Sequence, residues 1–183
     1  NLSVSASQFT ENYAELSGGA IYSEIDLEIS NGSTFTYNEG EDDGGAVYGT
    51  DNIEISGYSS FVGNIADNYG GAVYSQDNAA VENASFTGNE ASTEQGGAIY
   101  VEDDLSLIGS DLSNNSAQDE GGAAYVKDNA DVSSTSFSGN ISHDEGGALY
   151  VQEDLTIRDG SSFSRNYSGS NEDGGAVYVE LGD

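Results

Sequence analysis

Apolar residues recur along this chain as pairs spaced two residues apart, which is the spacing of side chains on one face of a β-strand. A polar residue usually separates the two members of a pair, and turns rich in Gly, Asn, Asp and Ser separate the segments. No stretch shows the apolar period of about 3.6 residues that marks a helix, so we expect no helix. The seven pairs are Leu2/Val4, Leu27/Ile29, Ile53/Ile55, Ala79/Val81, Leu105/Leu107, Ala130/Val132 and Leu155/Ile157.

A second pattern, FxxN, begins seven or eight positions after the start of each pair. Its first position holds all six phenylalanines of the protein, and its asparagine is present in every copy. A polar residue that never varies suggests a ladder of stacked amides at a bend, with each amide bonded to its neighbour or to a turn backbone group. The aromatic slot contains Phe9, Phe35, Phe61, Phe86, Leu112, Phe137 and Phe163, and the asparagines are Asn12, Asn38, Asn64, Asn89, Asn115, Asn140 and Asn166.

The third pattern is the pentapeptide GGAxY, which occurs seven times at intervals of 25 to 28 residues. The residue after the alanine, and the one two positions later, are mostly aliphatic, so we predict that both face the core. The alanine and the tyrosine would then face outward. The reverse orientation would bury tyrosine hydroxyls, each of which needs a hydrogen-bond partner. The tyrosines are Tyr22, Tyr48, Tyr74, Tyr100, Tyr125, Tyr150 and Tyr178.

A fixed period in the range of about 20 to 50 residues is typical of a solenoid. We therefore predict an all-β fold, a parallel β-solenoid that forms one domain over residues 1–183. Each coil would contain three short strands and would pair its backbone with the next coil at roughly 4.8 Å. The seven coils are expected at residues 1–23, 24–49, 50–75, 76–101, 102–126, 127–151 and 152–183, and are called coils 1 to 7 below.

Tandem GGA[I/V/L] motifs that alternate with FxxN resemble the repeats of the chlamydial polymorphic outer-membrane proteins. The resemblance covers the whole chain, and it is carried by the GGA triplets that begin at Gly18, Gly44, Gly70, Gly96, Gly121, Gly146 and Gly174 and by the FxxN pairs. It implies an autotransported, right-handed β-helical passenger that acts in adhesion at the cell surface or outside the cell, with a host or cell-surface ligand as partner.

The charge of the chain narrows its range of partners. It has 33 Asp and Glu residues against three Lys and Arg, a net charge of −30. Such a chain repels phosphate backbones and anionic lipids, so we expect no nucleic-acid partner. No apolar run is long enough for a bilayer span, so we expect no membrane insertion. The absence of cysteine excludes only a disulfide scaffold.

Carboxylates precede several of the Gly pairs, and neighbouring coils would bring them together. Two like charges about 4.8 Å apart repel by roughly 1 kcal/mol in water-like dielectric, and a bound Ca²⁺ would reverse this effect. Calcium could therefore bind at Asp42, Asp43, Asp119, Glu120, Asp144 and Glu145, although no motif requires a cofactor. The alternative is a solvated acidic face that ordinary salt screens.

We expect no enzyme, because a catalytic site should interrupt the repeat and His143, the only histidine, falls in a variable acidic turn. The favoured function is an extracellular structural or adhesive rod. The chain starts on the apolar-pair strand and ends just after GGAVY, so copies could stack head to tail, or coils could continue in a longer array. The alternative function is a carbohydrate-binding or polysaccharide-processing β-helix, which a pocket lined by irregular turns would favour.

Overall fold

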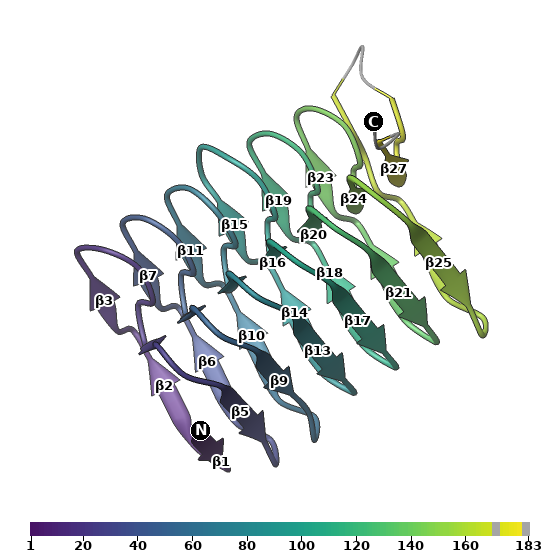
Figure 1. Cartoon of the computed structure of the whole chain (residues 1–183). Coiled ribbons are helices and arrows are strands. Elements are labelled where there is room, and N and C mark those ends of the chain that lie inside the picture. Colours follow the sequence, from purple (N-terminus) through teal and green to yellow (C-terminus); the bar gives the residue numbers. More distant parts are fainter. Residues whose placement is uncertain (170–172, 181–183) are drawn as a thin grey trace.

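The molecule is a stack of coils whose strands form four parallel sheets. The computed structural model describes residues 1–169 and 173–180. Each of coils 1 to 6 contributes one strand to every sheet, and the coils follow one another along a single axis (Figure 1). The parallel β-solenoid predicted from the repeat is confirmed. Within the described residues, no helix could cross a lipid bilayer.

Sheet A contains the apolar pairs. Successive strands pair in register, so that Leu27 lies beside Leu2 and Ile53, and the intervening polar residues form an outer row. The inward side chains of coils 2 to 6 are at most 4% exposed. The strands of sheet A are β1 (Leu2–Ser5), β5 (Leu27–Ser30), β9 (Ile53–Ile55), β13 (Ala79–Glu82), β17 (Leu105–Ile108), β21 (Ala130–Ser133) and β25 (Leu155–Arg158).

Sheet B contains the aromatic slot, and its phenylalanine rings stack along the core. The ring centroids of Phe35 and Phe61 are 4.7 Å apart with an interplanar angle of 2°. Leu112 interrupts this file between Phe86 and Phe137, and it is fully buried. The strands of sheet B are β2 (Gln8–Thr10), β6 (Thr34–Thr36), β10 (Ser60–Val62), β14 (Ser85–Thr87), β18 (Asp111–Ser113), β22 (Ser136–Ser138) and β26 (Ser162–Ser164).

Sheet C was not expected, and it corrects the prediction of three strands per coil. Its strands are only two residues long and follow the ladder asparagine, with a small buried residue such as Ala66 or Ala91 at the second position. Two residues are too few to show an alternating pattern. The strands are β3 (Tyr13–Ala14), β7 (Glu39–Gly40), β11 (Ile65–Ala66), β15 (Glu90–Ala91), β19 (Ser116–Ala117) and β23 (Ile141–Ser142), and coil 7 adds an isolated bridge between Ile141 and Tyr167.

Sheet D follows the Gly pairs and closes each coil. Val47, Val73 and Ile99, in the slot after alanine, are fully buried in the core, as predicted. In coils 1 to 6 the second glycine of the pair lies where adjacent backbones meet most closely: a Cβ on Gly71 would be 2.2 Å from the Gly97 carbonyl oxygen. The strands of sheet D are β4 (Ile21–Ser23), β8 (Val47–Gly49), β12 (Val73–Ser75), β16 (Ile99–Val101), β20 (Ala124–Val126), β24 (Leu149–Val151) and β27 (Val177–Val179).

Candidate functional site

The asparagines of FxxN form a continuous amide ladder inside the solenoid. Asn64 Nδ2 donates to Asn89 Oδ1 at 2.9 Å and to the Phe35 carbonyl at 3.1 Å. The same Asn89 oxygen accepts the Asn64 backbone N–H at 3.0 Å. The five asparagines from Asn38 to Asn140 are fully buried. Every hydrogen-bonding group of these interior amides is satisfied, so the ladder is structural and offers nothing to a ligand.

The tyrosines of GGAxY also stack. They were expected to face outward, but in the structure most of them are not exposed to solvent. Tyr48, Tyr74, Tyr100, Tyr125 and Tyr150 are 3% to 8% exposed and form a second apolar cluster beside the core. The centroids of neighbouring rings along this stack are 4.8 to 5.1 Å apart. The alanines were also expected outside, but Ala46, Ala72, Ala98, Ala123 and Ala148 are fully buried and belong to the main core.

Two of the buried tyrosine hydroxyls donate to carboxylates on the turns that follow sheet D. Tyr74 Oη donates to Glu102, and Tyr150 Oη donates to Glu180 at 2.9 Å. Burial, followed by these carboxylate contacts, raises the pKa of both phenols above the usual value. In coil 1, where no preceding ring covers it, Tyr22 is 53% exposed.

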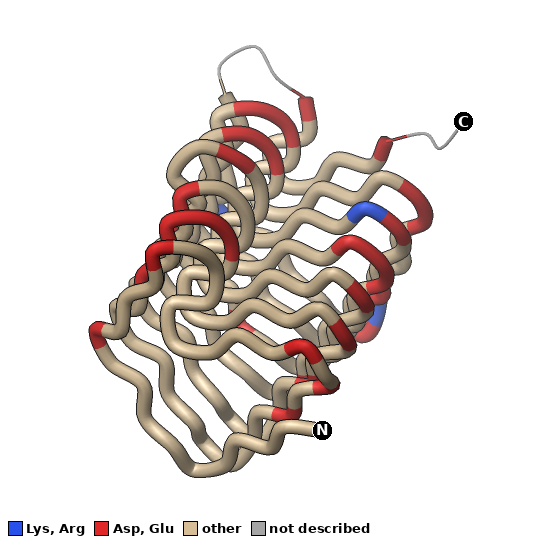
Figure 2. Tube along the Cα trace, turned by 60° about the vertical axis from the view of Figure 1, so that its left-hand side comes forward, with Lys and Arg blue, Asp and Glu red and all other residues tan. Residues whose placement is uncertain are grey.

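Carboxylates occupy the turns on two sides of the solenoid, in rows along the stack (Figure 2). The turns that precede the Gly pairs carry one of these rows. Burial there raises the pKa of Asp43 to about 6, with a further contribution from Asp42, and Asp43 Oδ1 is buried with no hydrogen-bond partner among the described residues. Burial also raises the pKa of Glu94, Asp119 and Glu120.

Three of the six carboxylates expected to bind calcium come together. One ligand oxygen from each of Glu120, Asp144 and Glu145 lies within 4.8 Å of the other two. Glu120 Oε2 is buried and has no hydrogen-bond partner in the described part of the chain, so it could be satisfied by a cation. Asp42 and Asp43 lie on an earlier coil, and the position after Asp43 in the same row is Tyr69, so these two do not join the group.

Two of the three basic residues pair with the acidic surface. Lys127 Nζ lies 3.3 Å from Glu102 and 5.7 Å from the centre of the Tyr100 ring. Arg158 forms a two-pronged contact with Asp131, at 3.1 and 2.7 Å. His143 is exposed, and its Nδ1 lies 3.2 Å from the Ala117 carbonyl oxygen. These side chains are dispersed rather than gathered around one reacting centre.

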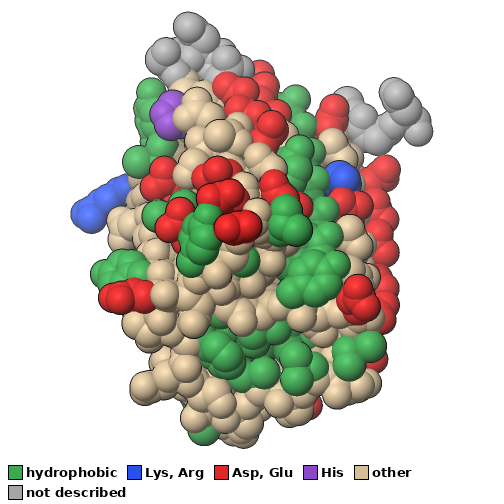
Figure 3. Space-filling model, turned by 90° about the vertical axis from the view of Figure 1, so that its left-hand side faces the viewer, with side chains coloured by type: hydrophobic (Ala, Val, Ile, Leu, Met, Phe, Trp, Pro, Cys, Tyr) green, Lys and Arg blue, Asp and Glu red, His purple; other side chains and the backbone are tan. Residues whose placement is uncertain are grey.

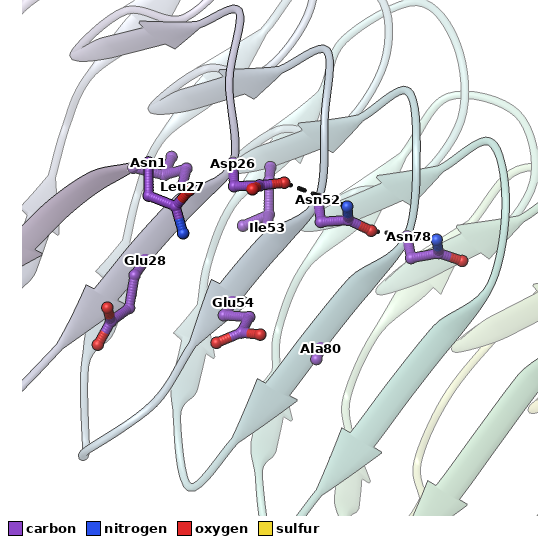
Figure 4. Close-up of a pocket in the computed structure, with 9 residues that line it drawn as sticks. All are labelled: Asn1, Asp26, Leu27, Glu28, Asn52, Ile53, Glu54, Asn78 and Ala80. Carbon is purple, nitrogen blue, oxygen red and sulfur yellow. Dashed lines mark hydrogen bonds between the residues drawn. The ribbon is translucent and has the colours of Figure 1, made fainter.

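The outer face of sheet A carries an open groove, and Figure 4 shows the residues that line one end of it. This end has a volume of about 280 Å³, and the exposed side chains of Glu28 and Glu54 lie on its floor. One wall is a second ladder, in which Asn78 Nδ2 donates to Asn52 Oδ1 at 3.1 Å and Asn52 Nδ2 donates to Asp26 Oδ1 at 3.2 Å.

This outer ladder was missed by the sequence reasoning, although the signal was present. Every apolar pair is directly preceded by Asn or Asp, and the six positions that follow coil 1 are Asp26, Asn52, Asn78, Asp104, Asn129 and Asp154. Asn129 Nδ2 donates to Asp104 Oδ1 at 2.9 Å, so carboxylates accept where amides donate. The row therefore mixes amides and carboxylates instead of repeating one residue.

Comparisons with known proteins identify the repeat. Four segments match the model of the Chlamydia polymorphic membrane protein repeat, at residues 6–24, 58–76, 83–102 and 134–152. Each segment runs from FxxN through GGAxY, and together they make up less than half of the chain. The resemblance of the repeats to this family is confirmed. No curated protein and no solved structure matches the chain.

Proposed function

We propose that this chain, a solenoid with repeats of the Chlamydia polymorphic membrane protein type, is a stiff non-enzymatic rod that acts outside the cell or at its surface in adhesion. The repeat type and the fold fit a structural, adhesin-like role at a surface. The observation that carries the proposal is the unbroken register of the four sheets. It places a fully bonded amide ladder and a tyrosine stack along the whole axis, so the interior supports a long, regular surface.

Adhesion can be tested with beads that display the purified chain. We expect the beads to attach to cultured epithelial cells, and soluble chain to compete with them. Beads coated with an unrelated protein of similar acidity and size are the control for charge. Equal attachment by the two kinds of bead, or no competition by the soluble chain, would contradict the adhesive role.

We also propose that copies of this chain assemble end to end. Strands β1, β2, β3 and β4 each lie at the edge of a sheet. Coil 1 and the turn that leads into coil 2 expose four large apolar side chains by 37% to 69%, namely Leu2, Leu16, Tyr22 and Ile25. Figure 3 shows this end of the molecule, where hydrophobic side chains are visible between the acidic ones. A second copy whose last coil matches this edge would pair with it and cover the apolar surface.

Sedimentation velocity at increasing protein concentration tests this assembly, in high salt so that charge repulsion is screened. We expect species that grow with concentration, and Leu16→Asp together with Ile25→Asp should suppress them. A single monomeric species at every concentration would contradict assembly.

We also propose that Ca²⁺ binds at Glu120, Asp144 and Glu145. The support is the convergence of three carboxylate oxygens and the buried, unpartnered Glu120 Oε2. The ion would stabilise two adjacent turns and would take no part in a reaction.

A further inference from the structure

The corner between sheets A and B changes in depth along the solenoid. In coils 2, 3 and 7 the aromatic slot follows the first residue of the apolar pair after eight positions, whereas in coils 4, 5 and 6 it follows after seven. The longer turns contain Asn31-Gly32, Gly57-Tyr58 and Asp159-Gly160, and the shorter turns have the single residues Asn83, Gly109 and Ser134 in their place. All of these residues have positive φ, so the turns are alike except for the added residue. The corner is therefore set back over three coils, with a longer turn at each end.

A hollow of about 400 Å³ lies in this recess. Tyr58 forms its wall on coil 3, Asn83 and Gly109 line it on the side of the turns, and Ser85, Asp111 and Ser136 line it on the side of sheet B. The last three residues occupy consecutive register positions on β14, β18 and β22. At roughly 4.8 Å per coil, three coils give the recess a length of roughly 14 Å.

The polar groups in the recess are free to bind a ligand. Across residues 1–169 and 173–180, the side chains of Ser85, Asp111, Ser136 and Tyr58 have no hydrogen-bond partner. Two hydroxyls and a carboxylate therefore face the recess with unused donors and acceptors. Tyr58 is 81% exposed, the highest value among the large hydrophobic residues of the described part of the chain, although an aromatic side chain gains free energy when it is covered.

We propose that this recess binds a short, neutral oligosaccharide along the solenoid axis. The Tyr58 ring offers an apolar face for a sugar ring, and the hydroxyl, amide and carboxylate groups match the hydroxyls of sugars. The net charge of −30 disfavours anionic sugars. The acidic groove over sheet A is a weaker candidate, because the residues that line it include no aromatic side chain. The proposal goes beyond the structural role, because it assigns a ligand site to the surface of the rod.

Binding can be tested with maltotriose, cellotriose, mannotriose and chitotriose as neutral probes and trigalacturonate as the anionic probe. Saturation-transfer NMR detects binding through the signals of the sugar. Chemical-shift changes of the Tyr58 ring signals then locate the bound sugar on the protein. We expect at least one neutral trisaccharide to bind at millimolar concentration, and trigalacturonate not to bind. Absence of binding by all four neutral probes, or binding of trigalacturonate alone, would overturn the proposal.

Two variants locate the site. Tyr58→Ala should weaken binding about tenfold, which corresponds to about 1.4 kcal/mol. Tyr37→Ala is the matched control, because Tyr37 is also an exposed tyrosine with positive φ but does not line the recess. Insertion of one glycine between Asn83 and Ala84 gives coil 4 the longer turn of coil 2 and should abolish binding while the circular dichroism spectrum stays unchanged. Equal weakening by Tyr37→Ala, or full binding by the folded insertion variant, would overturn the assignment.

Discussion

The residue that most directly joins one coil to the next is the ladder asparagine. Asn89 is fully buried, and its side chain takes part in four hydrogen bonds, to Phe61, Asn115 and twice to Asn64. We expect Asn89→Ala to lower the free energy of unfolding by roughly 3 kcal/mol or more, because it leaves several buried polar groups without partners. Urea denaturation measures the change.

Asn12 provides the control for this variant. It is exposed on coil 1, and its side chain donates one hydrogen bond, to Asn38. Asn12→Ala should therefore cost about 1 kcal/mol or less. If the two variants lost the same free energy, the interior amides would not be the groups that hold the coils together.

The raised pKa of Asp43 predicts that the free energy of unfolding depends on pH. Burial raises its pKa to about 6 in the folded state, above its ordinary value of 3.8, so the folded state opposes ionisation. The free energy of unfolding should therefore fall as the pH rises through about 6. Asp43→Asn should stabilise the protein at pH 7 and should have little effect at pH 4, as measured by thermal unfolding at both values.

The control for Asp43→Asn is Glu39→Gln, which removes an exposed charge from the same coil. At pH 7, Glu39→Gln should raise the melting temperature less than Asp43→Asn does. A gain from Asp43→Asn that was equal at the two pH values would refute the pKa argument.

Sequence reasoning succeeded for residues whose partner is another copy of the same residue. The asparagines and phenylalanines repeat in phase, so their stacking follows from the period. The burial of the tyrosines was not predicted, because the groups that satisfy their hydroxyls, such as Glu102 and Glu180, occupy a position whose residue type differs from coil to coil. A single sequence does not show which variable side chain will reach a given hydroxyl.

At the scale of the elements, the Gly pairs set the distance between coils. A Cβ on Gly71 would lie 2.2 Å from the Gly97 carbonyl oxygen and 2.4 Å from the Glu90 carbonyl oxygen, both of which are backbone atoms. Gly71→Ala should therefore separate β12 from β16 and prevent native packing there. Gly88 has a φ of +65° but no atom within 4 Å of the added Cβ, so Gly88→Ala should cost only about 1 kcal/mol. Thermal unfolding of both variants compares the two costs, and equal values would contradict this account.

Binding of Ca²⁺ at the acidic turns before the Gly pairs can be tested by thermal unfolding. Addition of Ca²⁺ at constant ionic strength should raise the melting temperature, and a chelator should reverse the change. Glu145→Gln should reduce the response, whereas Glu153→Gln, on an exposed turn after sheet D, should leave it intact. A melting temperature that did not change with Ca²⁺ would contradict the proposed site.

The elements themselves could be predicted to different degrees. The strands of sheets A, B and D each contain an alternating or invariant pattern, and the sequence indicated all three. Sheet C consists of two-residue strands, and its inward position holds Ala14, Gly40, Ala66, Ala91, Ala117 or Ser142, which resembles turn composition. The recess at the corner of sheets A and B was visible as a change of one residue in turn length, but its depth depends on how neighbouring coils stack.

At the scale of the whole molecule, folding must overcome the mutual repulsion of the acidic rows. The chain has 33 acidic residues against three Lys and Arg, and stacking brings like charges on adjacent turns about one strand spacing apart. Each such pair costs roughly 1 kcal/mol in water-like dielectric. Salt shortens the range of this repulsion from about 30 Å at 0.01 M to about 3 Å at 1 M. The melting temperature should therefore rise with sodium chloride, and scanning calorimetry would measure it.

Charge repulsion between the acidic rows also predicts that the effect of salt on the melting temperature depends on pH. Carboxylates that become protonated at pH 4 no longer repel, so the increase in melting temperature with salt should be smaller at pH 4 than at pH 7. A general effect of salt on water structure would instead give similar increases at both pH values. If the increase were equal, charge repulsion between coils would not limit the stability of the stack, and the hydrogen-bonded ladders and apolar core would have to account for it alone.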